Sequence, residues 1–307
     1  MKIEYAIIIR DKTRLEQLIE RFNSKAQAKF YIESSGGTFN DYEVESDTFY
    51  KSLSKVKEAV SKLLKNKVIY RSFLPTYIFT EKDLIIVIGQ DGLVANTAKY
   101  VNRKPIIGIN PDINRYDGLL LQHSPSDLKT LIKNMMVGNY DVKEVTMAKA
   151  TLNDGQSLLA FNDFYIGADS HISSRYTIEF NEEKEQQSSS GIIVSTGAGS
   201  TGWLSSIFNM TNSINSILNP KQPNSSFNLN WEDNKLFFIV REPFSSKVTG
   251  TSIGYGIINK NNTLKIASNM STKGVIFSDG IETDFLNFNS GSIVEIGLAD
   301  EKALLVS

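Results

Sequence analysis

A carboxylate stands in a glycine-rich turn directly after a run of branched apolar residues. The run Leu84–Ile88 has the composition of a strand that is buried on both faces, and Gly89, Gln90, Asp91 and Gly92 follow it. In open α/β sheets, ligands bind in the crevice outside the carboxyl ends of the strands. Glycines in such a turn let the backbone approach a phosphate closely. Asp91 therefore lies where a ligand could bind, although an ordinary strand-to-helix turn has the same composition.

Two further segments carry polar groups suited to a nucleotide. Asn162 and Asp163 place an amide beside a carboxylate, a pair that can grip the vicinal hydroxyls of a ribose but is also common in turns. Ser189–Trp203 runs from an apolar strand through a loop of small and hydroxyl residues into a helix. Such a loop exposes backbone N–H groups that suit a phosphate, and a flexible connector is the alternative. Another segment, Arg241–Phe244, is interpreted more simply as a stiff turn with a surface arginine.

The elements that would position these groups begin with an alternation of strands and helices. The predicted strands and apolar helical stripes are residues 5–9, 13–22, 52–65, 68–79 (strand-like and interrupted by Pro75), 84–88, 93–101 and 104–110. Alternation of this kind is typical of a doubly wound, mostly parallel sheet. Residues 25–50 are polar and contain Gly36-Gly37, so we expect a surface excursion there rather than a core element.

After residue 120, apart from one helix at 126–136, short strands follow one another in series. Asn153-Asp154-Gly155 is a strong hairpin signal, and Ser278-Asp279-Gly280 is another turn. We therefore predict an α/β N-terminal domain at residues 1–120 and a mainly antiparallel β C-terminal domain at residues 121–307, whose last strand could return to the first domain. The stretch 209–234 is rich in Asn, Ser and Pro and is predicted to be a mobile loop.

The composition excludes several classes of function. A net charge of −1 provides no basic field for nucleic acid, so we expect no nucleic-acid partner. Without cysteine there is no disulfide framework or thiolate metal site, and His123 and His171 cannot form a zinc site by themselves. The amino-terminal apolar run is too short for a signal peptide, and no apolar run could span a bilayer. We expect a soluble, cytoplasmic protein without a membrane partner.

Taken in order and at these separations, the polar segments resemble the NAD kinase family. In that family a Gly-Gly-Asp-Gly loop ends an inner strand, an Asn-Glu pair lies in the β domain, and a Gly-x-x-x-Ser-Thr-x-x-Gly-Ser/Thr-x-Ala-Tyr segment closes the site. Gly89–Gly92, Asn162-Asp163 and Gly191–Trp203 look like these segments. The resemblance runs from about residue 84 to the carboxyl end. It is strongest to the mitochondrial-type subgroup, through Gly108–Asp112, Arg115, Gly118, Ser190-Gly191, Trp203 and Arg241-Glu242-Pro243. The sequence shows no transit peptide, which favours a bacterial member.

The resemblance implies an ATP-dependent NAD kinase, which transfers the γ-phosphoryl group of ATP to the adenosine ribose 2′-hydroxyl of NAD and forms NADP. Asp91 would be the general base or orienting group, and Asn162 and Asp163 would hold the dinucleotide. Mg²⁺ would be bound by ATP and water, so no protein metal site is expected. Because the family forms homo-oligomers, a dimer or tetramer is expected. The other binding residues implied are Gly89, Gln90, Gly92, Asn110, Ser195, Thr196, Ser200, Thr201, Gly202, Trp203 and Ser206.

Departures from the family pattern leave alternatives open. Gln90 stands where the family has its second glycine, and a side chain there restricts φ and fills space near the phosphates. It could weaken ATP binding or change the phosphate donor. One alternative is an NAD-binding protein with lost or altered kinase activity. Another is a lipid kinase of the diacylglycerol or sphingosine type, against which Asn162-Asp163 and the loop 195–203 argue. The sequence does not decide between NAD and NADH, between ATP, other nucleotides and polyphosphate, or between oligomeric states.

Overall fold

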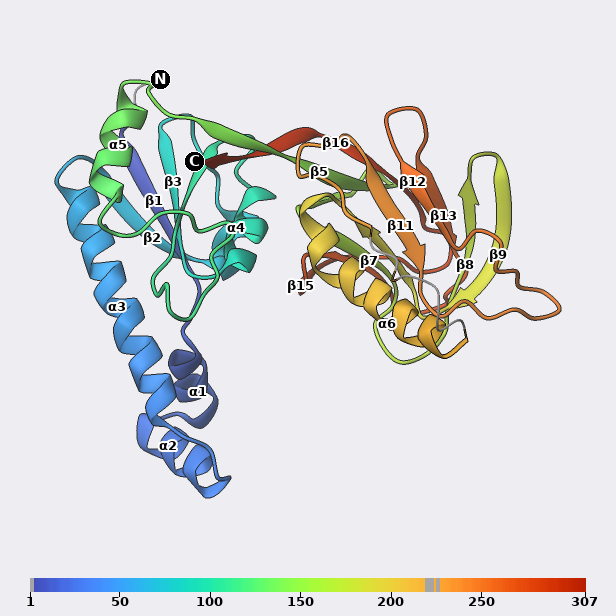
Figure 1. Ribbon diagram of the computed structural model, residues 1–307, viewed down its shortest axis with the longest axis horizontal. Coiled ribbons are helices and arrows are strands. Elements are labelled where there is room, and N and C mark those ends of the chain that lie inside the picture. The colour runs from blue at the N-terminus through green and yellow to red at the C-terminus, as the bar shows by residue number, and fades with distance from the viewer. Residues whose placement is uncertain (1–2, 219–223, 225–226) are drawn as a thin grey trace. The chain divides into compact units, whose positions relative to one another are not determined.

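The computed structural model describes residues 3–218, 224 and 227–307, which form two compact units (Figure 1). The first comprises Met1–Lys143 with Leu304–Ser307, and the second comprises Glu144–Ala303. The boundary follows residue 143 rather than residue 120 because helix α5 (Leu128–Met136) buries Leu128, Ile132 and Met135 in the core of the first unit.

The first unit is built on a parallel sheet with the strand order β2-β1-β3-β4, followed by the end of β16. The strands are β1 (Tyr5–Arg10), β2 (Lys65–Tyr70), β3 (Asp83–Ile88), β4 (Pro105–Ile109) and β16 (Ile293–Val306). Leu304 and Leu305 at the end of β16 pair with β4. Every residue of the run Leu84–Ile88 is buried, as its branched apolar composition predicts.

Helices cover both faces of this sheet (Figure 1). Helix α3 (Asn40–Ser61) and α5 pack on one face, where Leu53 and Ile132 join a core with Ile8 and Ile86. Helix α4 (Asp91–Ala98) lies on the other face and begins directly after the turn that follows β3. A short 3₁₀ helix, η1 (Arg71–Thr76), follows β2. The predicted doubly wound α/β architecture is confirmed.

Most of residues 25–50 are helical and enclose a small core, so the prediction that this stretch contains no core element is wrong. Helix α1 (Arg14–Phe22), helix α2 (Lys25–Ser34) and the start of α3 enclose a small core of their own. Leu15, Ala28 and Phe39 are its buried members. These apolar residues are widely spaced among polar ones, and a helix pair that buries so few side chains gives little periodic signal in the sequence.

The second unit consists of antiparallel strands in two layers around one core. One sheet has the order β12-β11-β10-β7-β14-β15, and the other layer includes β13, β8 and β9. Phe164, Ile192 and Phe238 from the first sheet meet Tyr176 and Ile266 from the second. The strands are β5 (Val142–Leu152), β6 (Ser157–Ala160), β7 (Asp163–Ala168), β8 (Ser174–Phe180), β9 (Glu183–Ser189), β10 (Ile192–Ser195), β11 (Leu236–Val240), β12 (Tyr255–Ile258), β13 (Leu264–Ser268), β14 (Gly274–Ser278) and β15 (Ile281–Asn287). The prediction of a mainly antiparallel β domain is confirmed.

Helix α6 (Trp203–Leu218) packs on the outer face of the six-stranded sheet, after a 3₁₀ turn, η2 (Ala198–Thr201). Along β10, Ile192 and Val194 enter the core between the layers, whereas Ile193 packs with Ile207 of α6. Helix α6 occupies residues 209–218 of the stretch predicted to be a loop, so that part of the prediction is wrong. Residues 219–223 and 225–226 of the same stretch lie outside the described residues. No helix within the described ranges is long and apolar enough to cross a membrane.

Candidate functional site

Asp91 is the first residue of α4 and lies at the carboxyl end of the inner strand β3. Its carboxylate accepts hydrogen bonds from the backbone N–H groups of Leu119 (3.3 Å) and Leu120 (2.8 Å). These bonds reach 28 and 29 residues along the chain, so the carboxylate fixes the loop after β4 and is itself fixed by it. Its oxygens keep further lone pairs for a ligand, and the residue is half-buried.

Gln90 is unstrained in the turn before α4. Its backbone is extended, with φ −112° and ψ 162°, a conformation that any residue adopts. The expected restriction of φ at this position is therefore absent. The carboxamide Nε2 of Gln90 donates to the Tyr116 hydroxyl at 3.4 Å, which is a weak contact with the loop after β4. Beside Asp91, a Cβ built on Gly92 would have no atom within 4 Å, so the space above this residue is open.

Asn110 organises the same loop and is buried. Its side-chain amide donates to the Tyr116 carbonyl at 3.0 Å, and its side-chain oxygen accepts from the Asp112 N–H at 3.0 Å. Gly118 lies close by with φ +67°, and a Cβ there would come within 2.6 Å of the Asn110 amide nitrogen. The structure thus gives Asn110 a supporting role, because it shapes the loop whose N–H groups hold Asp91.

In the second unit, the segment Phe161–Asp163 is fixed from two sides. The Asn162 N–H donates to Asp279 Oδ1 at 2.6 Å, and the Asn162 carbonyl accepts from the Thr196 N–H at 2.9 Å. The Thr196 hydroxyl donates to the Phe161 carbonyl at 2.6 Å. Asp163, the first residue of β7, is the register partner of Ser195. The structure therefore brings together Asn162, Asp163, Ser195 and Thr196, four of the residues that the resemblance implies for binding.

Asp163 has an unusual electrostatic environment. Its side chain is buried, and Asp279 of the turn between β14 and β15 lies close by. Burial, and secondarily the negative charge of Asp279, raise the pKa of the Asp163 carboxyl to about 7. A carboxyl that titrates near neutral pH can change from hydrogen-bond donor to acceptor within the physiological range, and such groups cluster at functional sites.

The glycine-rich loop after β10 is packed rather than flexible. A Cβ on Gly197 would clash with the Asn230 carbonyl, and one on Gly199 would clash with the Asn162 carbonyl. The Ser200 hydroxyl is buried and has two acceptors within reach of its one proton, Asn228 Oδ1 and the Gly197 carbonyl, both at 2.7 Å. The flexible-connector alternative is thus wrong for this loop.

The end of this loop faces solvent. Thr201, Gly202 and Ser206 are exposed, and the Ser206 hydroxyl reaches the Gly202 carbonyl at 3.4 Å. Because α6 begins at Trp203, the first backbone N–H groups of a 16-residue helix lie beside these residues. Such a helix start can hold an anion, so the buried part of the loop supports the site and its exposed end can contact a ligand.

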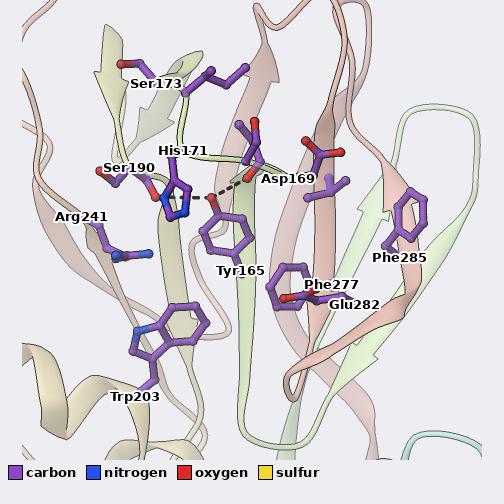
Figure 2. A pocket seen from close by; sticks show the side chains of 14 residues that line it. Tyr165, Asp169, His171, Ser173, Ser190, Trp203, Arg241, Phe277, Glu282 and Phe285 are labelled. Atoms are coloured by element: carbon purple, nitrogen blue, oxygen red, sulfur yellow. Dashed lines mark hydrogen bonds between the residues drawn. The ribbon is translucent and has the colours of Figure 1, made fainter. Parts of the chain in front are cut away.

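A pocket of about 700 Å³ opens on the outer face of the six-stranded sheet (Figure 2). Trp203 lies parallel to Tyr165, with ring centroids 6.0 Å apart and an interplanar angle of 8°, and Phe277 lies 5.0 Å from Tyr165 on centroids. The Arg241 guanidinium lies over the Trp203 ring at 5.5 Å. The remaining polar lining comes from Asp169, Ser170, His171, Ser173, Ser190 and Glu282. An aromatic shelf with a charged rim suits a planar, polar ring.

The pocket contains side chains that the sequence analysis missed. Arg241 was interpreted as a surface residue, yet it lines the pocket together with Trp203. Tyr165, His171 and Phe277 carried no pattern that distinguishes a ligand pocket from a strand face. Only Arg241 could have been found from the sequence, because the segment Arg241–Phe244 had been noted there. Within the described residues, no group of three or more His, Asp or Glu side chains could hold a metal ion.

Sequence comparison shows partial similarity to known enzymes, although no family model matches the chain. An NAD kinase of Chlorobaculum tepidum is 30% identical over 125 residues, which are 39% of this chain and 43% of that protein. An NAD kinase of Clostridium kluyveri is 33% identical over 129 residues, which are 39% of this chain and 44% of that protein. An NAD kinase of Burkholderia cenocepacia is 29% identical over 143 residues, which are 44% of this chain and 46% of that protein. The match thus spans less than half the length of each of these relatives.

Structural comparison extends over the whole chain. The crystal structure of an NAD kinase from Archaeoglobus fulgidus in complex with ATP superposes with a TM-score of 0.60 at 14% identity and covers 99% of this chain and 93% of that chain. The crystal structure of yeast NADH kinase complexed with NADH gives a TM-score of 0.60 at 12% identity and covers 100% of this chain and 84% of that chain. At these identities the likeness shows a shared fold, which agrees with the predicted fold class.

Proposed function

We propose that this chain, which is similar to NAD kinases in part of its sequence and in its fold, transfers the γ-phosphoryl group of ATP to the adenosine ribose 2′-hydroxyl of NAD and forms NADP. The observation that carries the proposal is the geometry of Asp91. Its carboxylate stands at the carboxyl end of an inner strand and at the start of a helix, and two backbone N–H groups hold it. This is the location at which α/β sheets bind ligands, and it suits a group that must meet one hydroxyl.

The proposed chemistry makes modest demands on the protein. Phosphoryl transfer passes through a loose transition state, so alignment and neutralisation of charge contribute most of the catalysis. Asp91 would accept the proton of the 2′-hydroxyl or orient that hydroxyl toward the γ-phosphorus. Gly92 leaves open space beside the carboxylate, which a phosphate or a ribose could occupy.

The second unit would hold the dinucleotide. The Asn162 and Asp163 side chains would bind ribose hydroxyls, and the exposed start of α6 at Thr201–Trp203 would meet a phosphate. The pocket lined by Tyr165, Trp203 and Arg241 has the size and the aromatic walls to take one ring of the dinucleotide. Each of these roles is a proposal that rests on contacts within this unit.

Mg²⁺ would enter with ATP. The ion would be coordinated mainly by phosphate oxygens and water, as Mg²⁺ commonly is in phosphoryl transfer. Its charge would offset that of the transferred group. The cytoplasmic location, the mitochondrial-type subgroup, the bacterial origin and a homo-oligomeric state stay predictions.

Two measurements on the purified protein test the proposal. Calorimetry with NAD and with NADH measures binding, and an assay for NADP or NADPH measures transfer from Mg-ATP, other nucleotides and polyphosphate. We expect NAD or NADH to bind and to be phosphorylated by at least one donor. Binding without any product from any donor would favour a dinucleotide-binding protein without transfer activity. Absence of binding would contradict both functions.

A further inference from the structure

We infer that Asp279 is a positioning residue for the dinucleotide: its carboxylate holds the Asn162-Asp163 pair in the conformation that binds the ribose. The inference rests on the proposed function of that pair. Asp279 lies in the turn between β14 and β15, and it is more than 110 residues from the segment that it contacts.

The carboxylate of Asp279 accepts hydrogen bonds from three consecutive backbone N–H groups. Oδ2 accepts from Phe161 at 3.1 Å, and Oδ1 accepts from Asn162 at 2.6 Å and from Asp163 at 3.3 Å. In return, the Asp279 N–H donates to the Asp163 carbonyl at 3.0 Å. Hydrogen bonds to a charged acceptor are stronger than neutral ones, so this set fixes the direction of the backbone.

The opposite side of the same segment is held by Thr196. Its N–H and hydroxyl bind the carbonyls of Asn162 and Phe161, at 2.9 and 2.6 Å. Both peptide groups that flank Asn162 are therefore fixed, each by Asp279 at its N–H and by Thr196 at its carbonyl. Because the peptide planes set the direction of the Cα–Cβ bond, the two contacts fix the direction in which the Asn162 side chain leaves the backbone.

A second hairpin in the same unit shows that a turn aspartate need not make such contacts. Asp154 lies in the Asn153-Asp154-Gly155 turn, and its carboxylate bonds within the turn, to the N–H and side-chain amide of Gln156 at 3.0 and 2.7 Å. Asp279 and Gly280 both have positive φ, at 54° and 69°, as a tight hairpin requires. Asn or Gly at position 279 would adopt the positive φ of the turn equally well. The turn therefore does not require a carboxylate, whereas the hydrogen bonds to Phe161–Asp163 use one.

The test compares Asp279→Asn and Asp279→Gly with the matched control Asp154→Asn in the full-length protein. Asn and Gly both tolerate positive φ, so the hairpin should survive both substitutions. We expect the Kd for NAD to rise about tenfold in Asp279→Asn and more in Asp279→Gly, as is usual when support for a binding group is lost. The control should keep the wild-type Kd, and the KM for ATP should change little in all three variants.

The pH profile separates positioning from general damage. The negative charge of Asp279 contributes to the raised pKa of Asp163, so in Asp279→Asn the midpoint of NAD binding should move to lower pH. Wild-type affinity for NAD in Asp279→Gly would overturn the inference and leave the proposed function intact. Failure of both Asp279 variants to fold would also overturn it, because Asp279 would then be a folding residue. A wild-type protein that binds no NAD would overturn the proposed function and this inference together.

Discussion

Each unit contains a carboxylate that holds a polypeptide segment by accepting its backbone N–H groups. In the first unit this carboxylate is also the proposed reacting group, whereas in the second unit it is not. Asp91 is half-buried, accepts two backbone N–H groups and is also the proposed reacting group. In the second unit, Asp279 accepts the backbone N–H groups, and the neighbouring Asp163 is left buried with a raised pKa. A carboxylate that is hydrogen-bonded to backbone keeps a fixed position. A buried carboxylate such as that of Asp163 has a raised pKa, so its charge changes near neutral pH.

The largest effect should follow from changing Asp91, because it both holds a loop and takes part in the reaction. Asp91→Asn keeps an oxygen that can accept an N–H group but removes the base. We expect kcat to fall about a thousandfold, within the usual range for a lost general base, while the Kd for NAD stays within about threefold. Steady-state kinetics and calorimetry measure the two quantities. Asp117→Asn, which changes an exposed carboxylate in the loop after β4, is the control. Wild-type turnover in Asp91→Asn would remove Asp91 from the chemistry.

An intermediate effect is expected from the titration of Asp163. The ribose hydroxyls are donors, so the ionised carboxylate should be the binding form. Its pKa of about 7 means that affinity for NAD should rise by about tenfold between pH 6 and pH 8. Calorimetry across this range measures it, and Asp163→Asn should flatten the profile. A flat profile in the wild type would show that the Asp163 carboxylate does not bind NAD.

The same pKa predicts how stability depends on pH. Because the folded pKa of Asp163 lies above the ordinary value of 3.8, the folded state binds the proton more tightly than the unfolded state. The stability that the protonated carboxyl contributes is fully present below about pH 4 and is lost as the pH rises to about 7. Asp163→Asn should therefore raise the melting temperature at pH 8 relative to the wild type and raise it less at pH 5. A larger gain at pH 5 would contradict the raised pKa.

The smallest effect should follow from Gln90→Gly. The extended backbone at position 90 needs no glycine, and the contact between the Gln90 carboxamide and the Tyr116 hydroxyl is long, at 3.4 Å. We expect the KM for ATP to change by less than about threefold, since a weak, exposed hydrogen bond contributes little. A tenfold or larger increase in KM would show that Gln90 is a ligand of the phosphate donor.

The sequence predicted the architecture well where apolar periodicity was strong. The run Leu84–Ile88 and the hairpin at Asn153-Asp154-Gly155 lie where their patterns placed them. It failed at residues 25–50, because a small helical core around Phe39 buries too few side chains to mark its period. A helix was predicted to follow the loop that ends at Trp203, but residues 209–218 of α6 were predicted to be a loop, because their Asn and Ser residues are typical of one.

The candidate site was predicted as a set of separate segments, not as a network of contacts. The proximity of Asn162, Asp163 and Thr196 agrees with the sequence argument. Asp279, by contrast, was identified only as a turn residue, since a hydrogen bond across more than 110 residues leaves no local pattern. The supporting role of Asn110 and the exposure of Arg241 to a pocket are likewise properties of tertiary packing.

The central claim is that this chain phosphorylates the 2′-hydroxyl of the adenosine ribose. The most direct test supplies the wild-type protein with Mg-ATP labelled at the γ-phosphoryl group, together with either NAD or the NAD analogue that lacks the adenosine 2′-hydroxyl. The account predicts that the label appears on the 2′-oxygen of NAD and that the analogue stays unlabelled. Label on the analogue, or no labelled product from bound NAD, would contradict it.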